Sequence, residues 1–172
     1  MSIRQIEIIS KLDNSTFETN TNSASHSGLL RSLIEDYKEE NEFIIPDIRG
    51  EVLGVVIRYL ETHQGKEGIL NLPKPLKNYD LKEYISEEDF IFLERYNDDI
   101  YGLFELMNAA NYLDVKSLLE LCCAKAACLT KDLKTEQFLE VFQIDQDMSE
   151  EDIRKRLLIF GTEELIKNDL NN

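Results

Sequence analysis

The apolar pattern from residue 100 to residue 129 constrains the fold more than any other part of the chain. In its first half, apolar side chains recur three, four and seven positions apart, which is the spacing of one face of a helix. That face contains Ile100, Leu103, Phe104, Met107 and Ala110. A second apolar face contains Leu106, Ala109 and Leu113. Because both faces are apolar, we expect other parts of the protein to cover this helix on two sides.

The second half of the segment predicts another helix. Its apolar stripe is formed by Val115, Leu118, Leu119, Cys122, Ala126 and Leu129. Asp114 stands between the two stripes, and its carboxylate suits the start of a helix because it accepts hydrogen bonds from the unpaired amides of the first turn. The segment therefore predicts a helical hairpin, with Asp114 as the N-cap of the second helix. Taken alone, such a hairpin is typical of a structural core.

The charge of the chain argues against two classes of partner. Among its 172 residues are 34 acidic and 19 basic side chains, a formal net charge of −15. Nucleic acids and anionic lipid surfaces are bound through Lys and Arg, which replace condensed counterions. We therefore expect no binding to nucleic acid or to a membrane. The acidic surplus suits either simple solubility or a basic partner.

The remaining composition predicts an intracellular protein whose fold needs no metal ion or disulfide bond. The length is that of one domain, or of one domain with an appendage, and it is sufficient to bury a core without a metal or a disulfide. No apolar run approaches the roughly 18 residues of a membrane span, and the start of the chain lacks the layout of a signal peptide. Three clustered cysteines, Cys122, Cys123 and Cys128, favour a reducing compartment over a disulfide framework.

The first 63 residues predict a small α/β arrangement. The predicted strands run from Ile6 to Lys11, from Thr16 to Thr19 and from Glu42 to Ile45. One helix, capped by Ser25 or Ser27, follows the second strand, and another runs from about Glu51 to His63. The order strand, strand, helix, strand, helix is that of an α/β fold.

The segment between this part and the hairpin is irregular. Residues 64–85 contain glycines, prolines and lysines that offer little to bury, and we expect 64–78 to be mobile and dispensable. Ser86 then predicts the cap of a short helix, and Asp98 or Asp99 the cap of the hairpin.

The tail after Lys131 predicts three short helices, beginning near Thr135, after Ser149 and near Thr162. Helices shorter than about 12 residues are marginal in water, so their large apolar side chains must pack either on the hairpin or on another protein. We expect residues 135–170 to be weakly ordered in the free chain. The side chains that lack neighbours in this view are Phe142, Ile144, Ile153, Leu157 and Phe160.

The sequence contains no convincing pattern of catalytic residues. A cysteine nucleophile needs an adjacent base, and nothing in the sequence connects the cysteines with His26 or His63. A zinc site needs about four converging ligands, whereas Cys122 and Cys123 point to different sides of a helix. The paired acids stand at predicted helix starts, where the helix dipole explains them, and the glycines follow no phosphate-binding pattern. The sequence therefore predicts no catalytic residue, no metal site and no cofactor.

Asn111 and Tyr112 are the residues hardest to explain as part of a core. Polar groups at the end of a buried helix destabilise a protein unless they find partners. Two interpretations fit. In one, Asn111 caps the helix end and Tyr112 lies at its rim; in the other, the pair binds another protein. The residues themselves leave both interpretations open.

The amino-acid sequence of the hairpin resembles that of a known protein family. The resemblance is carried by Leu103-Phe104-Glu105-Leu106, by Ala109-Ala110-Asn111-Tyr112-Leu113-Asp114, and by Lys116, Leu118 and Leu119. This run is similar to the signature of the Skp family, the S-phase kinase-associated adaptors of SCF ubiquitin ligases. Elongin C and other BTB/POZ proteins share the part at 109–114, but this chain continues beyond it as Skp adaptors do. The resemblance spans nearly the whole chain.

The resemblance implies an architecture and a function. It implies an α/β BTB/POZ domain, a short three-stranded sheet with helices, over residues 1–131, and a helical F-box-binding tail over 132–172. The implied function is that of a non-catalytic adaptor, cytoplasmic and nuclear, which joins the amino-terminal domain of a cullin to F-box proteins. In Skp adaptors the pair that matches Asn111 and Tyr112 contacts the cullin. The positions that match the F-box groove are Phe104, Met107, Leu119, Cys123 and Ala126, and from the tail Phe142, Ile144, Ile153 and Leu157.

The chain departs from the family pattern in four places. Thr135 stands where the family has a proline, and the usual ending is replaced by residues 158–172. The chain has no tryptophan, and Glu88 stands at one family tryptophan position. Between Leu93 and Leu103 it is longer than usual. These departures indicate a divergent member.

Two other functions stay open. A Skp-like subunit of an F-box assembly outside ubiquitin ligases, such as a kinetochore or vacuolar-ATPase regulator, would need the groove but not Asn111 and Tyr112. An Elongin-C-like or self-associating BTB protein would not need residues 132–172. Formation of a homodimer by the free chain also stays open.

Overall fold

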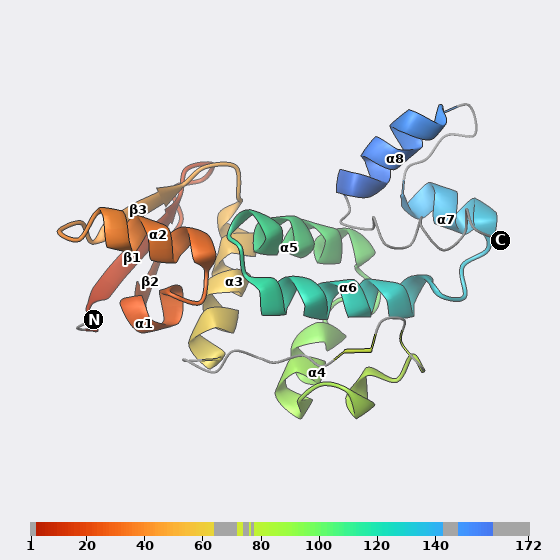
Figure 1. Cartoon of the computed structure of the whole chain (residues 1–172), viewed down its shortest axis with the longest axis horizontal. Coiled ribbons are helices and arrows are strands. Elements are labelled where there is room, and N and C mark those ends of the chain that lie inside the picture. The colour runs from red at the N-terminus through yellow and green to blue at the C-terminus, as the bar shows by residue number, and fades with distance from the viewer. Residues whose placement is uncertain (1–2, 64–71, 74–75, 77, 143–147, 160–172) are drawn as a thin grey trace. The chain divides into compact units, whose positions relative to one another are not determined.

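The computed structural model describes residues 3–63, 72–73, 76, 78–142 and 148–159 (Figure 1). The backbone divides into two compact units. Unit 1 consists of Met1–Ile69 and Ala109–Leu119, and unit 2 consists of Leu70–Asn108 and Glu120–Asn172. The division expected from the resemblance, between residues 131 and 132, stays a prediction.

The sheet of unit 1 has three strands in the order β2-β1-β3. Their bounds are β1 Gln5–Ser10, β2 Thr16–Asn20 and β3 Glu42–Ile45. Strand β1 pairs antiparallel with β2 and parallel with β3. Alternation along the strands buries one face, which includes Ile6, Ile8, Phe43 and Ile45. The expected α/β fold with a short three-stranded sheet is confirmed.

Three helices complete the first part of unit 1, namely α1 Thr21–Ala24, α2 Gly28–Asp36 and α3 Gly50–Thr62. Ser27 caps α2, because its hydroxyl accepts a hydrogen bond from the Leu30 N–H at 3.1 Å. Of the two caps expected here, Ser27 is therefore the one used. Strand β2 and helix α3 approach closely at Gly54, where a Cβ would lie 2.6 Å from Cε1 of Phe17. Glycine at this position lets the helix lie against the sheet.

The turn between β1 and β2 holds the start of α3. The Asp13 carboxylate accepts a hydrogen bond from the Ser15 N–H at 3.1 Å and another from the Gly50 N–H at 2.8 Å. These two backbone donors hold the pKa of the Asp13 carboxyl at about 2, below its ordinary value of 3.8. A negative charge here also suits the positive end of the α3 dipole.

From residue 81 onward, the described helices begin with a 3-10 turn, η1 Leu81–Glu83, and end with α8. Their bounds are α4 Glu87–Glu94, α5 Ile100–Tyr112, α6 Lys116–Thr130, α7 Thr135–Val141 and α8 Glu150–Ile159. The division between the units falls within α5 and within α6. None of the helices in the described part of the chain combines the length and the hydrophobicity needed to cross a membrane.

The helix caps expected in this part are present. The Ser86 hydroxyl accepts from the Asp89 N–H at 3.0 Å, and the Asp99 carboxylate accepts from the Gly102 N–H at 2.9 Å. The segment 64–78, expected to be mobile, lies largely outside the described residues, and the helix expected over 162–170 lies wholly outside them.

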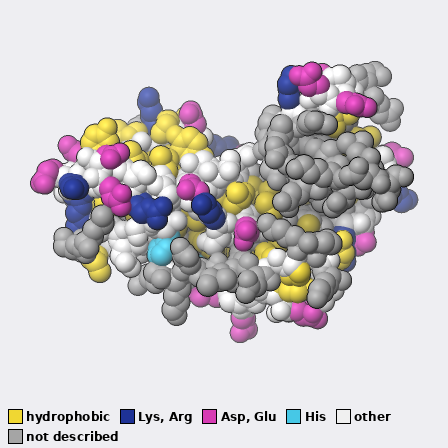
Figure 2. Space-filling view, viewed as in Figure 1, with side chains coloured by type: hydrophobic (Ala, Val, Ile, Leu, Met, Phe, Trp, Pro, Cys, Tyr) yellow, Lys and Arg dark blue, Asp and Glu magenta, His cyan; other side chains and the backbone are white. Residues whose placement is uncertain are grey.

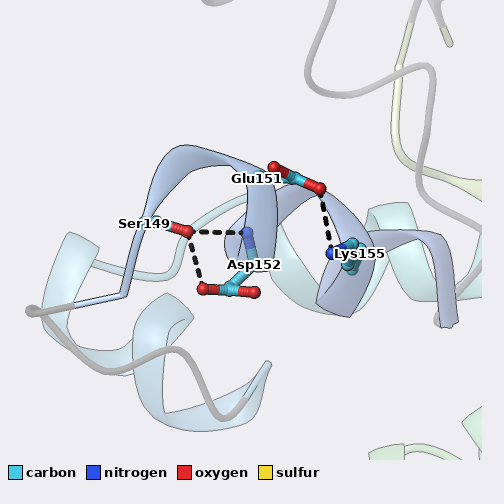
Figure 3. A network of polar contacts seen from close by, with 4 residues as sticks. All are labelled: Ser149, Glu151, Asp152 and Lys155. Atoms are coloured by element: carbon cyan, nitrogen blue, oxygen red, sulfur yellow. Dashed lines mark hydrogen bonds and ion pairs between the residues drawn. The ribbon is translucent and has the colours of Figure 1, made fainter.

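Helix α8 is stabilised by contacts within its own first turns (Figure 3). The Ser149 hydroxyl donates to Asp152 Oδ2 at 2.6 Å and accepts from the Asp152 N–H at 3.2 Å. One turn on, Lys155 Nζ lies 2.9 Å from Glu151 Oε1. All of these partners are three or four residues apart, so they stabilise the start of the helix locally.

Candidate protein-binding surfaces

The hairpin turns at residues 109–115, which we call the α5 corner. Helix α5 ends at Tyr112, and Asp114 adopts a left-handed backbone conformation with φ of 52°. The Asp114 N–H donates to the Asn111 carbonyl at 3.1 Å, and the Val115 N–H donates to the Ala110 carbonyl at 2.8 Å. This pair of bonds is the Schellman closure of a helix end. Asp114 therefore terminates α5, and the prediction that it caps the next helix is wrong, since α6 begins only at Lys116.

The start of α2 lies against the α5 corner. The Ser27 hydroxyl donates to the Leu113 carbonyl at 2.5 Å, and the Leu29 N–H donates to the same carbonyl at 3.3 Å. The Gly28 N–H donates to the Asp114 carbonyl at 3.0 Å. Unpaired amides at a helix start thus meet unpaired carbonyls at a helix end, and each satisfies the other. The partial charges of the two helix ends are also opposite.

Gly28 lies very close to the side chain of Asp114 in this contact. A Cβ on Gly28 would lie 2.0 Å from Asp114 Oδ2 and 2.7 Å from its Cγ, which is too close for any side chain unless Asp114 moves. The backbone of Asp114 is already fixed by the corner. The pair Ser27-Gly28 and the pair Leu113-Asp114 are therefore shaped to each other, although they are far apart in the sequence.

Burial divides the residues of the α5 corner into two sets. Ala109, Ala110 and Leu113 are buried, with at most 3% of each exposed. Asn111 and Tyr112 are exposed, Tyr112 by 43%. The expected cost of burying their polar groups therefore does not arise. The hydrogen bond that Asn111 accepts at this helix end uses its backbone carbonyl. The buried set accounts for the fold, which leaves Asn111 and Tyr112 as an exposed pair at a well-bonded helix end.

The residues expected to line the F-box groove differ in exposure. Four are buried, with no more than 5% exposed: Phe104, Met107, Ala126 and Phe142. Three are partly exposed: Leu119, Cys123 and Ile153. Leu157 lies on α8 but its side chain is outside the described part, and Ile144 lies wholly outside it. The groove assignment stays a prediction, and its buried members are occupied by contacts within the chain.

Phe142 joins the tail to α5. Its ring centroid lies 5.4 Å from that of Phe104 and 4.4 Å from that of Phe138, both at tilted angles. Tilted aromatic pairs at these separations add to the stability that burial provides. The prediction that Phe142 lacks neighbours in the free chain is therefore wrong. Phe138 was not assigned to the groove, although its spacing of four residues from Phe142 is the signal that would have included it.

The cysteines of α6 have the environment of structural thiols. Cys122 is fully buried, and desolvation raises its pKa well above the ordinary value. Burial also raises the pKa of Cys128, although the charges of Lys125 and Lys131 oppose the shift. A raised pKa keeps the thiol protonated, whereas a nucleophile or a metal ligand needs the thiolate. Within the described residues, no three His, Cys, Asp or Glu side chains are grouped as a metal site requires.

Two protein-family models match the chain. Residues 4–65 match a model described as the Skp1 family, tetramerisation domain, and residues 116–157 match one described as the Skp1 family, dimerisation domain. The first match covers the sheet and helices α1 to α3, and the second begins with α6 and extends into α8.

Individual proteins are similar over most of their length. An S-phase kinase-associated protein 1 homolog of Tetrahymena thermophila is 35% identical over 141 residues, which are 82% of this chain and 83% of that protein. SKP1-like protein 10 of Arabidopsis thaliana is 32% identical over 152 residues, 88% of this chain and 91% of that protein. The E3 ubiquitin ligase complex SCF subunit sconC of Arthroderma benhamiae is 31% identical over 133 residues, 75% of this chain and 77% of that protein.

Proposed function

Because this chain belongs to the Skp1 family, we propose that it is a non-catalytic adaptor that joins a cullin to F-box proteins in a ubiquitin ligase of the SCF type. The name of the Arthroderma relative, an SCF subunit, supports this proposal. The proposal assigns two surfaces. Asn111 and Tyr112 bind the amino-terminal domain of the cullin, and the residues of α5, α6 and the tail bind the F-box.

The exposure of Asn111 and Tyr112 at the α5 corner is the observation that carries the proposal. The corner is closed by its own hydrogen bonds and by those from α2, so the pair is presented without further ordering. A pre-ordered backbone loses less entropy on binding. An aromatic residue in such a position belongs to the class that dominates binding energies at protein interfaces.

The F-box surface requires a change at the tail. Phe142 covers Phe104 in the free chain, so an apolar helix that binds at Phe104 must displace it. In this proposal the side chains of the F-box replace the ring of Phe142 against α5, while the partly exposed Cys123 and Ile153 make the first contacts. Hydrogen exchange tests this step, because amides of α7 should change their protection when an F-box segment binds.

The two-surface proposal is tested with the double variant Asn111→Ala/Tyr112→Lys. Affinity for a cullin amino-terminal domain should fall by about 30-fold or more, the equivalent of about 2 kcal/mol for a central aromatic anchor. Affinity for an F-box segment should not change. The matched control is Tyr37→Lys, because Tyr37, the residue that follows the end of α2, is also exposed, by 57%. An unchanged cullin affinity in the double variant would falsify the assignment of this pair.

Two further results of the same titrations distinguish the alternatives. If the wild-type chain binds an F-box segment but no cullin, it serves an F-box assembly outside ubiquitin ligases. Removal of residues 132–172 should abolish F-box binding and leave cullin binding intact. Retention of all partners without the tail would instead identify an Elongin-C-like protein.

A further inference from the structure

The outer face of the sheet in unit 1 carries two rows of side chains that lie outside the buried core. Strand alternation turns Ile6 and Ile8 inward and Glu7 and Ile9 outward. In the paired register, Glu7 lies opposite Glu18 on β2 and opposite Glu42 on β3. Ile9 lies opposite Thr16 and Ile44 in the same way. We call the residues Glu7, Glu18, Glu42, Ile9 and Ile44 the outer sheet face.

The row of three glutamates is unfavourable for folding. Directly opposed residues on neighbouring strands have Cβ atoms about 5 Å apart, and like charges at that separation destabilise a sheet. Among the described residues, no Lys, Arg or His forms an ion pair with Glu7, Glu18 or Glu42. Glutamate is also a poor strand former. Within the part of the chain that the structure describes, no ion pair offsets this local cost.

The neighbouring row has one apolar side chain that is exposed, Ile44 on β3. Ile44 is 61% exposed, whereas Phe43 and Ile45 on either side of it are 5% and 1% exposed. In Figure 2, hydrophobic side chains reach the surface along the upper edge of this unit, near the label β3 of Figure 1. In the described chain β3 is also an edge of the sheet, so its outer backbone groups lie beside no further strand. An edge of this kind is a template for one more strand.

We propose that the outer sheet face binds an extended basic segment of a partner protein, which adds as a strand beside β3. On an added strand, the residues next to Glu42 and Ile44 are two positions apart and both face outward. The segment should therefore carry Lys or Arg at one position and an aliphatic residue two positions away. Main-chain hydrogen bonds supply affinity in this mode of recognition, and the alternate side chains supply specificity.

Charge decides between a basic partner and a second copy of this chain. A two-fold contact through the same face would bring two sets of glutamates together, and the net charge of −15 adds to the repulsion. A basic segment instead neutralises the row and is attracted by the same field. This inference is independent of the proposed adaptor function, because it uses none of the residues assigned to the cullin or the F-box.

The test is a titration of the full-length 15N-labelled protein with short peptides, followed by amide chemical shifts. The probe is the blocked peptide Lys-Thr-Val-Thr-Lys, in which the two lysines and the valine share one face of a strand. The control is Lys-Val-Thr-Thr-Lys, with the same composition and charge but with valine on the opposite face. We expect shifts at β1 and β3 and about tenfold tighter binding of the probe, from the burial of one valine side chain.

Variants of the outer sheet face complete the test. Glu42→Gln and Ile44→Thr should each weaken binding of the probe peptide. The matched substitutions at exposed positions of α4, Glu94→Gln and Ile91→Thr, should leave that binding unchanged. All four positions are on the surface, so the variants should stay folded. Equal binding of the two peptides, shifts confined to other elements, or unaltered affinity in the Glu42 and Ile44 variants would each overturn the proposal. Sedimentation as a dimer that Ile44→Thr abolishes would overturn it in favour of self-association.

Discussion

The α5 corner and the tail are held by different kinds of contact. At the corner, Ser27 bonds to Leu113 across 86 residues of sequence, and both groups are buried. In the tail, Ser149 bonds to Asp152 across three residues, and both are exposed. The tail is joined to α5 by the ring of Phe142. The corner is therefore part of the cooperative core, whereas the contacts described at the start of α8 are local ones between exposed residues.

The largest effect that distinguishes the two regions is expected from Leu113→Ala. Leu113 is fully buried at the α5 corner, so removal of its side chain leaves a cavity in the core. The free energy of unfolding should fall by about 2–5 kcal/mol. Urea denaturation followed by circular dichroism measures it, with Leu12→Ala as the control because Leu12 is 56% exposed. A loss as small as that of the control would mean that the corner is not part of the core.

Replacement of the capping serine by alanine at the start of α2 and at the start of α8 compares the corner with the tail directly. Ser27→Ala removes a buried cap and the bond to Leu113, and should lower the free energy of unfolding by about 2 kcal/mol. Ser149→Ala removes an exposed cap and should cost about 0.5–1 kcal/mol, seen only as lower protection of α8 amides. Equal global losses from the two variants would show that the tail folds together with the corner.

A smaller effect is expected where the tail meets α5. Phe142→Leu keeps an apolar side chain but removes both aromatic pairs, which should weaken the attachment by about 1 kcal/mol. Amides of α7 should exchange faster, while those of the α5 corner should not change. Phe92→Leu is the matched control, since the ring of Phe92 packs edge-on to Tyr96 at 6.5 Å and lies outside the tail. Faster exchange throughout the corner would contradict a locally attached tail.

The smallest effect concerns pH at the start of α3. The Ser15 and Gly50 N–H groups lower the pKa of Asp13 to about 2, so the ionised carboxylate stabilises the folded state above the ordinary pKa of 3.8. This contribution should be lost as the pH falls from about 4 to about 2. In Asp13→Asn that pH dependence should be missing. Thermal unfolding of both proteins between pH 5 and pH 2 measures it. Parallel curves over this range would show that Asp13 titrates normally.

Local signals in the sequence located the elements well. The strand Glu42–Ile45 is bounded by Pro46 and alternates in polarity, and the structure has the same bounds. The cap at Ser86 and the one at Asp99 are also where helix-start chemistry places them. These features depend on residues within a few positions of each other, so a single sequence contains the information that decides them.

The role of Asp114 and the row of glutamates depend on contacts between residues far apart in the sequence, so the sequence alone did not predict them. Aspartate suits both the start of a helix and a left-handed helix end, so nothing near Asp114 distinguishes the two. In the structure the carbonyl of the left-handed Asp114 accepts a hydrogen bond from Gly28, which is far away in the sequence. The same holds for the glutamate row of the outer sheet face. Its members come from three separate strands and become neighbours only once the register is known.

The bond between Ser27 and Leu113 also has a consequence for synthesis of the protein. Strands β1 to β3 and helices α1 to α3 leave the ribosome before Leu113 exists. At about 5–20 residues per second, the 86 intervening residues take about 4–17 s to be made. Throughout that interval, the start of α2 lacks its partner carbonyls and the residues that bury the α5 corner are missing. During synthesis the donors at the start of α2 must therefore bond to water until the corner has been made.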